Sequence, residues 1–201
     1  MSGSEKTNDL YGGVRRAIEN PQIGELLPEE SQPIELTVDS VWQLPGGIPA
    51  SPDPDLFKKR LSPVQLAILD LSSKGYEPGE INREIGMNPV DIRREREGMI
   101  RTVLAKSMTH AAYLACVADA YDKPLDDLPE LKRELTPVQL RILWFEVNGR
   151  SRDEINAHFR LSRGAYEQNI AGIQSAVNGR TLPHAGRIAF DKKIIPSLNN
   201  L

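Results

Sequence analysis

The chain has 201 residues, of which 39% are hydrophobic, and it carries a formal net charge of −3 at pH 7. No apolar run approaches the ~20 residues that a membrane span requires, and no basic-then-apolar leader opens the sequence. We therefore expect a cytoplasmic protein without membrane contact. The single cysteine, Cys116, excludes an intramolecular disulfide.

The negative charge is concentrated at the N-terminus. Residues 1–55 contain 3 basic and 10 acidic residues, a net charge of −7. Residues 56–125 and residues 126–201 each contain 11 basic and 9 acidic residues, a net charge of +2. Because the local charge decides whether a surface attracts nucleic acid, the negative total does not exclude DNA binding.

Residues 1–55 give weak structural signals. Leu10, Val14 and Ile18 recur with helical spacing, and residues 34–38 alternate as a short strand would. Neither run is long enough to form a core, and residues 44–54 are rich in proline and glycine, which favours an extended linker. We expect an irregular acidic segment that is either mobile or docked on the rest of the chain.

The remainder of the chain is an internal repeat. A shift of 74 positions aligns residues 61–115 with residues 135–189 without a gap. The residues that are identical at matching positions are of many different types. We therefore predict two copies of one small module, copy one over residues 56–125 and copy two over residues 126–201. A module of this size buries only about 60% of its unfolded surface, so each copy alone should be marginally stable.

The first helix of each copy is marked at both ends. Ser62 and Thr136 each precede a proline and are followed three positions on by glutamine, the pattern of a capping box. Gly75 and Gly149 stand where a left-handed residue ends a helix.

Three further helices are expected in each copy. The second covers about residues 78–85 in copy one. In copy two the second helix begins at a capping box that starts with Ser151, and this helix ends near residue 159. After a three-residue turn, Asn88 or Ser162 caps a third helix, and a fourth begins near Thr109 or Pro183. A short second helix joined to a third by so tight a turn is a helix-turn-helix.

This pattern resembles the LuxR/GerE-type DNA-binding domain of bacterial transcription regulators. The motifs of copy one are Leu61-Ser62, Gly75, Glu80-Ile81, Met87-Asn88 and His110-Ala111 with Ala115. Those of copy two are Leu135-Thr136, Gly149, Glu154-Ile155, Leu161-Ser162 and His184-Ala185 with Ala189. The resemblance covers a little over half the chain and implies an all-α protein with two tandem four-helix modules after the acidic segment.

The chain departs from that family at the third helix. The family's Thr-Val pair at the start of this helix is Asp91-Ile92 in copy one and Ala165-Tyr166 in copy two. The Lys-Leu pair near its end is Thr102-Val103 and Ala176-Val177. These changes alter positions where the resemblance implies phosphate contacts. The family also usually joins a single such domain to a sensory or receiver domain, whereas here the domain is doubled.

The third helix of copy one carries the chemistry of a DNA reader. Arg93, Arg94 and Glu97 fall on one side of a helix, where the resemblance places the groove-facing residues. Arginine can hold guanine through two hydrogen bonds, and glutamate can accept one from cytosine. Basic residues nearby suit the phosphates: Arg96, Arg101 and Lys106. The alternative is a solvated charged face with internal ion pairs.

Copy two differs at the same place. Glu167, Gln168 and Ala171 replace Arg93, Arg94 and Glu97, and Arg163 is the one basic residue of its third helix. Gln168 and Asn169 could read adenine, although phosphate attraction is weak there. The alternative is a degenerate module kept for packing or for binding a partner. The complete predicted surface comprises Asn88, Arg93, Arg94, Arg96, Glu97, Arg101, Lys106, Ser162, Arg163, Glu167, Gln168 and Asn169.

The fourth helix of copy one is apolar almost all round, over residues 111–120. A helix packed on one side does not need this, so a second surface should cover it. The resemblance implies a dimer contact there, either with the other copy or with a second chain as a homodimer. The alternative is a helix buried within its own module.

No catalytic, cofactor or metal-binding motif is found, and His110 and His184 occupy matching positions where a structural role is expected. We therefore expect no enzymatic activity and no cofactor. The expected function is sequence-specific binding of double-stranded DNA by a transcription regulator. The alternative is an adaptor whose modules bind a protein such as RNA polymerase or another regulator.

Overall fold

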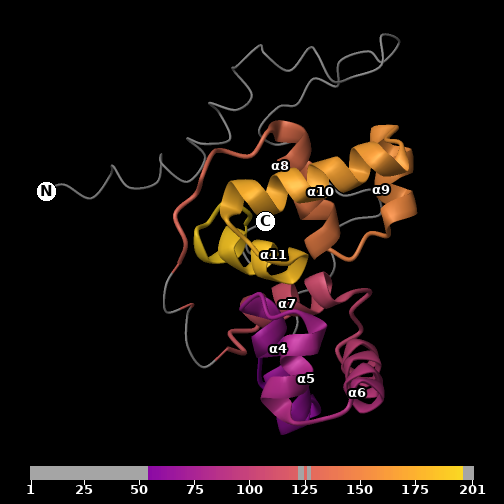
Figure 1. Ribbon diagram of the computed structural model, residues 1–201, viewed down its shortest axis with the longest axis vertical. Helices are drawn as coiled ribbons and strands as arrows, with labels where there is room; N and C mark the ends of the chain where they lie inside the picture. Colours follow the sequence, from indigo (N-terminus) through magenta and orange to yellow (C-terminus); the bar gives the residue numbers. More distant parts are fainter. Residues whose placement is uncertain (1–53, 122–124, 126–127, 197–201) are drawn as a thin grey trace, which may run out of the picture.

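The computed structural model describes residues 54–121, 125 and 128–196, which contain nine helices and no strand. The prediction of an all-α protein is thereby confirmed for the described part of the chain. Figure 1 shows the helices in two groups, with α7 and α11 adjacent between them. The expected helix at 10–18, the expected strand at 34–38 and the linker up to residue 53 lie outside the described residues.

Four helices recur along the chain at a constant offset. The four helices of copy one are α4 (Pro63–Ser73), α5 (Pro78–Ile85), α6 (Pro89–Thr102) and α7 (Met108–Val117). The four helices of copy two are α8 (Pro137–Val147), α9 (Arg152–Phe159), α10 (Arg163–Val177) and α11 (Leu182–Asp191). Each helix of copy two begins 74 positions after its counterpart, which is the offset found in the sequence.

The helix signals read from the sequence are confirmed. Complete capping boxes precede α4, α8 and α9, at Ser62, Thr136 and Ser151. The side chains of Asn88 and Ser162 cap α6 and α10 by accepting backbone N–H bonds. The residues after α4 and α8 turn through positive φ at Gly75 (87°) and Gly149 (75°).

One helix, at the start of the described residues, was not predicted from the sequence. Helix α3 (Pro54–Arg60) begins at Pro54, so the prediction that Pro54 belongs to an extended linker is wrong. Phe57 is buried and packs α3 into the core of copy one, next to Leu61. Seven residues are too few to show a helical period, so the sequence gives no periodic signal for this helix. The matching residues of copy two, 128–134, are not helical.

The two cores meet at α7, which is buried at every residue from Met108 to Val117. Ala111, Leu114 and Ala115 belong to the core of copy one. Tyr113 and Val117, one helical turn apart, belong instead to the core of copy two. Helix α7 is therefore apolar all round because it contributes to both cores.

The contacts between the copies are reciprocal. The ring of His184 packs against Gly75, so close that an added Cβ there would lie 2.4 Å from Nδ1. The ring of His110 packs against Gly149 in the same way, at 2.3 Å. Gly75 and Gly149 are matching positions, as are His110 and His184. The glycine of each copy thus contacts the histidine of the other copy. Such reciprocal contacts indicate that the two copies are related by an approximate twofold axis within one chain.

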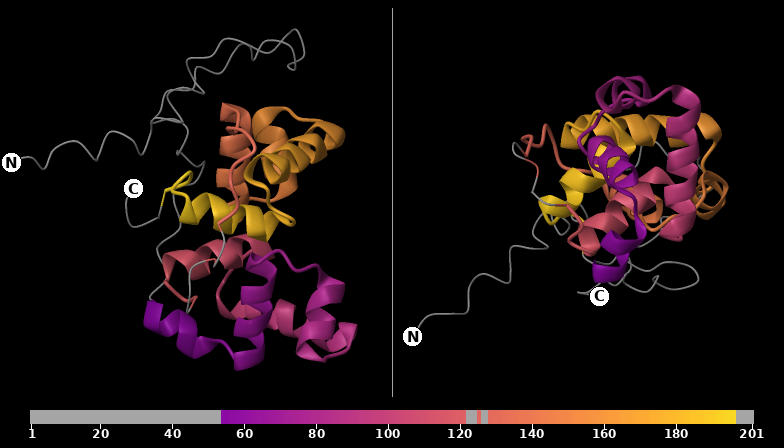
Figure 2. Two further views of the ribbon diagram at one scale, coloured as in Figure 1. Left: turned by 60° about the vertical axis from the view of Figure 1, so that its left-hand side comes forward. Right: turned by 90° about the horizontal axis from the view of Figure 1, so that it is seen from below.

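Further contacts hold the copies together along α11. The Arg180 guanidinium on the loop before α11 pairs with Glu80 of α5 at 3.0 Å. The Arg187 guanidinium lies over the Tyr121 ring, 3.8 Å from its centroid. The left view of Figure 2 shows α7 and α11 side by side. Of the two coverings expected for the fourth helix of copy one, the chain provides the other copy. No helix in the described ranges is long and apolar enough to cross a membrane.

Candidate nucleic-acid interface

Helix α6 presents one continuous exposed face. After its first residue, Pro89, its exposed residues recur with spacings of three, one, three and four, which places them on one side of a helix. We call this the α6 face, and it consists of Val90, Arg93, Arg94, Glu97 and Arg101. The opposite side, with Ile92 and Met99, is buried in the core of copy one. The three residues singled out as base readers therefore do share an exposed surface.

The charges of the α6 face are paired locally. Arg93 Nε lies 2.9 Å from Glu97 Oε1, and Arg94 Nη2 lies 2.8 Å from Asp91 Oδ1. The two arginine side chains are nevertheless 82% and 72% exposed. Exposed pairs of this kind contribute only about 0–1 kcal/mol, so a phosphate or a guanine can replace either carboxylate. The internal ion pairs anticipated as the alternative are present.

The remaining predicted residues of copy one lie at the edge of the α6 face or away from it. Asn88 is exposed but engaged as the cap of α6, with its amide also directed at the Asp91 carboxylate. Lys106 is exposed on the loop after α6. Arg96 lies one turn after buried Ile92 and is half-buried, and this burial lowers the pKa of its guanidinium. The contact of Arg96 with a DNA phosphate stays a prediction.

Helix α10 exposes the same five repeat positions. We call these residues the α10 face, and they are Gly164, Glu167, Gln168, Ala171 and Ser175. The α6 face carries three arginines and one glutamate, whereas the α10 face carries one glutamate and no basic residue. Arg163, just outside the α10 face, pairs with Glu167 at 3.0 Å. The two faces therefore correspond in position and differ in charge.

The other predicted residues of copy two are partly engaged. Gln168 is exposed. Asn169 is half-buried, and its amide donates to the Ala165 carbonyl of the same helix at 2.8 Å, which occupies one of its two donors. Ser162 is occupied as the cap of α10.

Contacts from the first helix of each copy fix the position of the third. In copy one, Gln65 Nε2 donates to Glu95 at 3.0 Å. In copy two, Gln139 lies so close to α10 that a Cβ on Gly172 would lie 2.4 Å from its Nε2. A second hydrogen bond between the first and third helices is specific to copy two, where the Tyr166 hydroxyl donates to the buried Glu146 carboxylate. Tyr166 therefore fastens α10 to α8.

Comparison of the chain with protein-family models, with curated proteins and with solved structures gives no match. The resemblance to the LuxR/GerE domain therefore rests on the motifs of this chain alone.

Two histidines at the junction between the copies, His110 buried and His184 half-buried, make stability depend on pH. Burial, assisted by the charge of Lys106, lowers the pKa of His110 to about 4. Burial also lowers the pKa of His184, with Arg180 and Arg187 acting in the same direction. Each ring nitrogen Nδ1 accepts a backbone N–H bond, from Lys106 or Arg180, at 3.2 Å.

We expect the protein to lose stability as the pH falls from about 6.5 towards 4. In that range the unfolded state binds protons that the folded state excludes, which for His110 amounts to about 2 kcal/mol between pH 7 and pH 5. Urea unfolding at the two pH values measures the loss. His110→Asn with His184→Asn keeps an acceptor for each backbone N–H but cannot titrate, so its unfolding free energy should change less. An equal loss in this variant would contradict the assignment.

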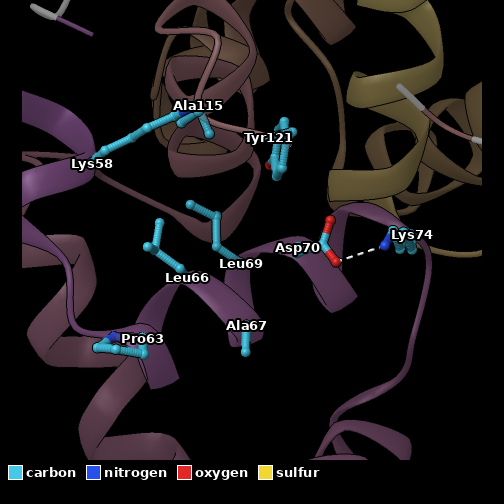
Figure 3. Close-up of a pocket in the computed structure, with 10 residues that line it drawn as sticks. Lys58, Pro63, Leu66, Ala67, Leu69, Asp70, Lys74, Ala115 and Tyr121 are labelled. Carbon is cyan, nitrogen blue, oxygen red and sulfur yellow. Dashed lines mark hydrogen bonds and ion pairs between the residues drawn. The ribbon is translucent and has the colours of Figure 1, made fainter. Parts of the chain in front are cut away.

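A groove of about 460 Å³ lies beside α3 and α4 in copy one. Figure 3 shows its apolar lining, which includes Leu66, Leu69 and Tyr121, and the Asp70–Lys74 ion pair at its edge. Within residues 54–121 and 128–196, no group of three His, Cys, Asp or Glu residues could hold a metal ion. Burial raises the pKa of the Cys116 thiol, which disfavours the reactive thiolate.

Sequence reasoning missed two features of the structure, one on the α6 face and one at the junction between the copies. Val90 lies on the α6 face, next to the charged run that contains Arg93 and its neighbours. Its spacing of three, four and seven residues to Arg93, Arg94 and Glu97 is visible in the sequence. The reciprocal contacts of Gly75 and Gly149 with the two histidines join residues about 110 and 40 positions apart, and no local pattern signals them.

Proposed function

We propose that this protein is a transcription regulator that binds double-stranded DNA sequence-specifically, with α6 as its principal reader. The observation that carries the proposal is the α6 face itself. Three exposed arginines stand on one side of α6, which follows α5 after a short turn. In a helix-turn-helix the helix at this place enters the major groove. Arg93 and Arg94 suit guanine, and Arg101 suits a phosphate.

The twofold relation of the copies supports a particular operator geometry. Recognition helices related by a twofold axis meet half-sites of inverted orientation. The α6 and α10 faces carry different side chains, so the inverted half-sites should differ in sequence. The α10 face can still bind, because α6 holds it near the DNA at a high effective concentration. We propose that one chain is enough to occupy both half-sites, since α7 and α11 already cover each other and leave no need for a second chain at this contact.

The salt dependence of binding to a duplex tests this proposal. A protein that neutralises Z phosphates loses affinity with salt along a log–log slope of about −0.9Z, because counterions are released. We expect a steep slope for the whole chain, corresponding to several phosphates. An adaptor without a DNA surface would bind a duplex weakly, with no preference for any sequence.

The second candidate function is supported by the α10 face. Gly164, Ala171 and Ser175 are small, and Glu167 repels phosphate, so this face suits a protein surface at least as well as DNA. In this case copy one binds DNA and copy two binds a partner such as RNA polymerase or another regulator. The two functions differ in whether base changes under copy two affect affinity.

A further inference from the structure

One residue of the α6 face is apolar and exposed. Val90 is 69% exposed in the first turn of α6, and it is followed on the same face by Arg93, Arg94 and Glu97. Surface valines are common, but this one stands within a surface that is otherwise charged. A binding partner of the α6 face therefore meets an apolar group beside two guanidinium groups.

Copy two has nothing equivalent at this position. The matching residue is Gly164, where an added Cβ would meet no atom within 4 Å. Space for a side chain is thus available at both positions, and only copy one uses it. The difference between the copies at this position cannot be attributed to packing.

Valine is suited to a fixed apolar contact. A β-branched side chain in a helix has one strongly preferred rotamer, so its methyl groups are held in place before binding. In the major groove the apolar feature is the C5-methyl group of thymine, which no other base of DNA carries. Contact between two such groups sacrifices little conformational freedom.

We infer that Val90 reads a thymine methyl group in the half-site under copy one; this inference rests on the proposed function. The helix rises about 1.5 Å per residue, so Val90 and Arg94 are separated by roughly 6 Å along the axis. That distance corresponds to about two steps of 3.4 Å between base pairs. The thymine therefore lies within about two base pairs of the guanine that Arg93 or Arg94 holds.

The test removes one methyl group at a time. In the preferred duplex, each thymine of the copy-one half-site is replaced by deoxyuridine, which lacks only the C5-methyl group. At one thymine within about two base pairs of the most sensitive guanine, the affinity of the wild-type protein should fall about fourfold, the effect of one buried methyl group. Val90→Ala should bind the thymine and deoxyuridine duplexes with the same affinity.

Leu104→Ala is the matched control. Leu104 is 76% exposed but lies on the loop after α6, outside the α6 face, so this variant should keep the fourfold difference. If the wild type and Val90→Ala respond equally to every replacement, or if the position holds no thymine, the inference is overturned while DNA binding stands. If the wild type prefers no duplex sequence at all, the proposed function itself fails.

Discussion

Arg93→Ala combined with Arg94→Ala is expected to weaken specific DNA binding by roughly 1 to 3 kcal/mol for each base that is no longer recognised. Both side chains project from the α6 face, and they form exposed ion pairs with Glu97 and Asp91. Removal of such pairs should change the unfolding free energy by about 1 kcal/mol or less. Titration of a fluorescent duplex measures the affinity, and the circular dichroism spectrum should be unchanged.

The repeat supplies a matched control for this prediction. Glu167→Ala combined with Gln168→Ala changes the same two repeat positions of the α10 face. Because Glu167 repels phosphate, the affinity of this variant should fall by less. Equal decreases in the two double variants would show that α6 is not the principal reader.

Gly149→Ala is expected to have the largest effect on stability. A left-handed backbone costs an alanine roughly 1–2 kcal/mol, and Gly149 has φ of 75°. The new methyl group would also lie 2.3 Å from His110 Nδ1, and overpacking of this kind costs roughly 1–3 kcal/mol. Together these effects lower the unfolding free energy by roughly 2–5 kcal/mol, measurable by urea unfolding.

Gly86→Ala isolates the backbone contribution. Gly86 has φ of 73°, but an added Cβ would meet nothing within 4 Å. The unfolding free energy of this variant should therefore fall only by the roughly 1–2 kcal/mol of a left-handed alanine. If Gly86→Ala and Gly149→Ala are equally destabilised, the close approach of His110 to Gly149 does not hold the copies together.

The sequence contained most of the local structure because local chemistry determines it. Serine, threonine and asparagine caps set where α4, α6, α8, α9 and α10 begin, and each cap is readable from a few adjacent residues. Helix α3 was not predicted because so short a helix around Phe57 shows no period, and its burial depends on a core assembled from distant residues.

The candidate site was predictable in part. The spacing of Arg93, Arg94 and Glu97 indicated a shared side of a helix, and the structure places them on one exposed face. Arg96 follows Ile92 by four residues, so its half-burial could also have been anticipated from the same spacing. The packing of α7 against α11 was not predictable in detail, because their partners are distant along the chain and matching positions carry different residues, such as Tyr113 and Arg187.

The sequence and symmetry of the bound DNA test the central claim most directly. Selection from random duplexes, followed by footprinting and by measurement of the number of chains bound, reports both. We expect one chain on two unlike half-sites in inverted orientation, spaced by about one helical turn, with base changes under copy one weakening binding more. A palindromic site that is equally sensitive in both halves and binds two chains would contradict the proposal.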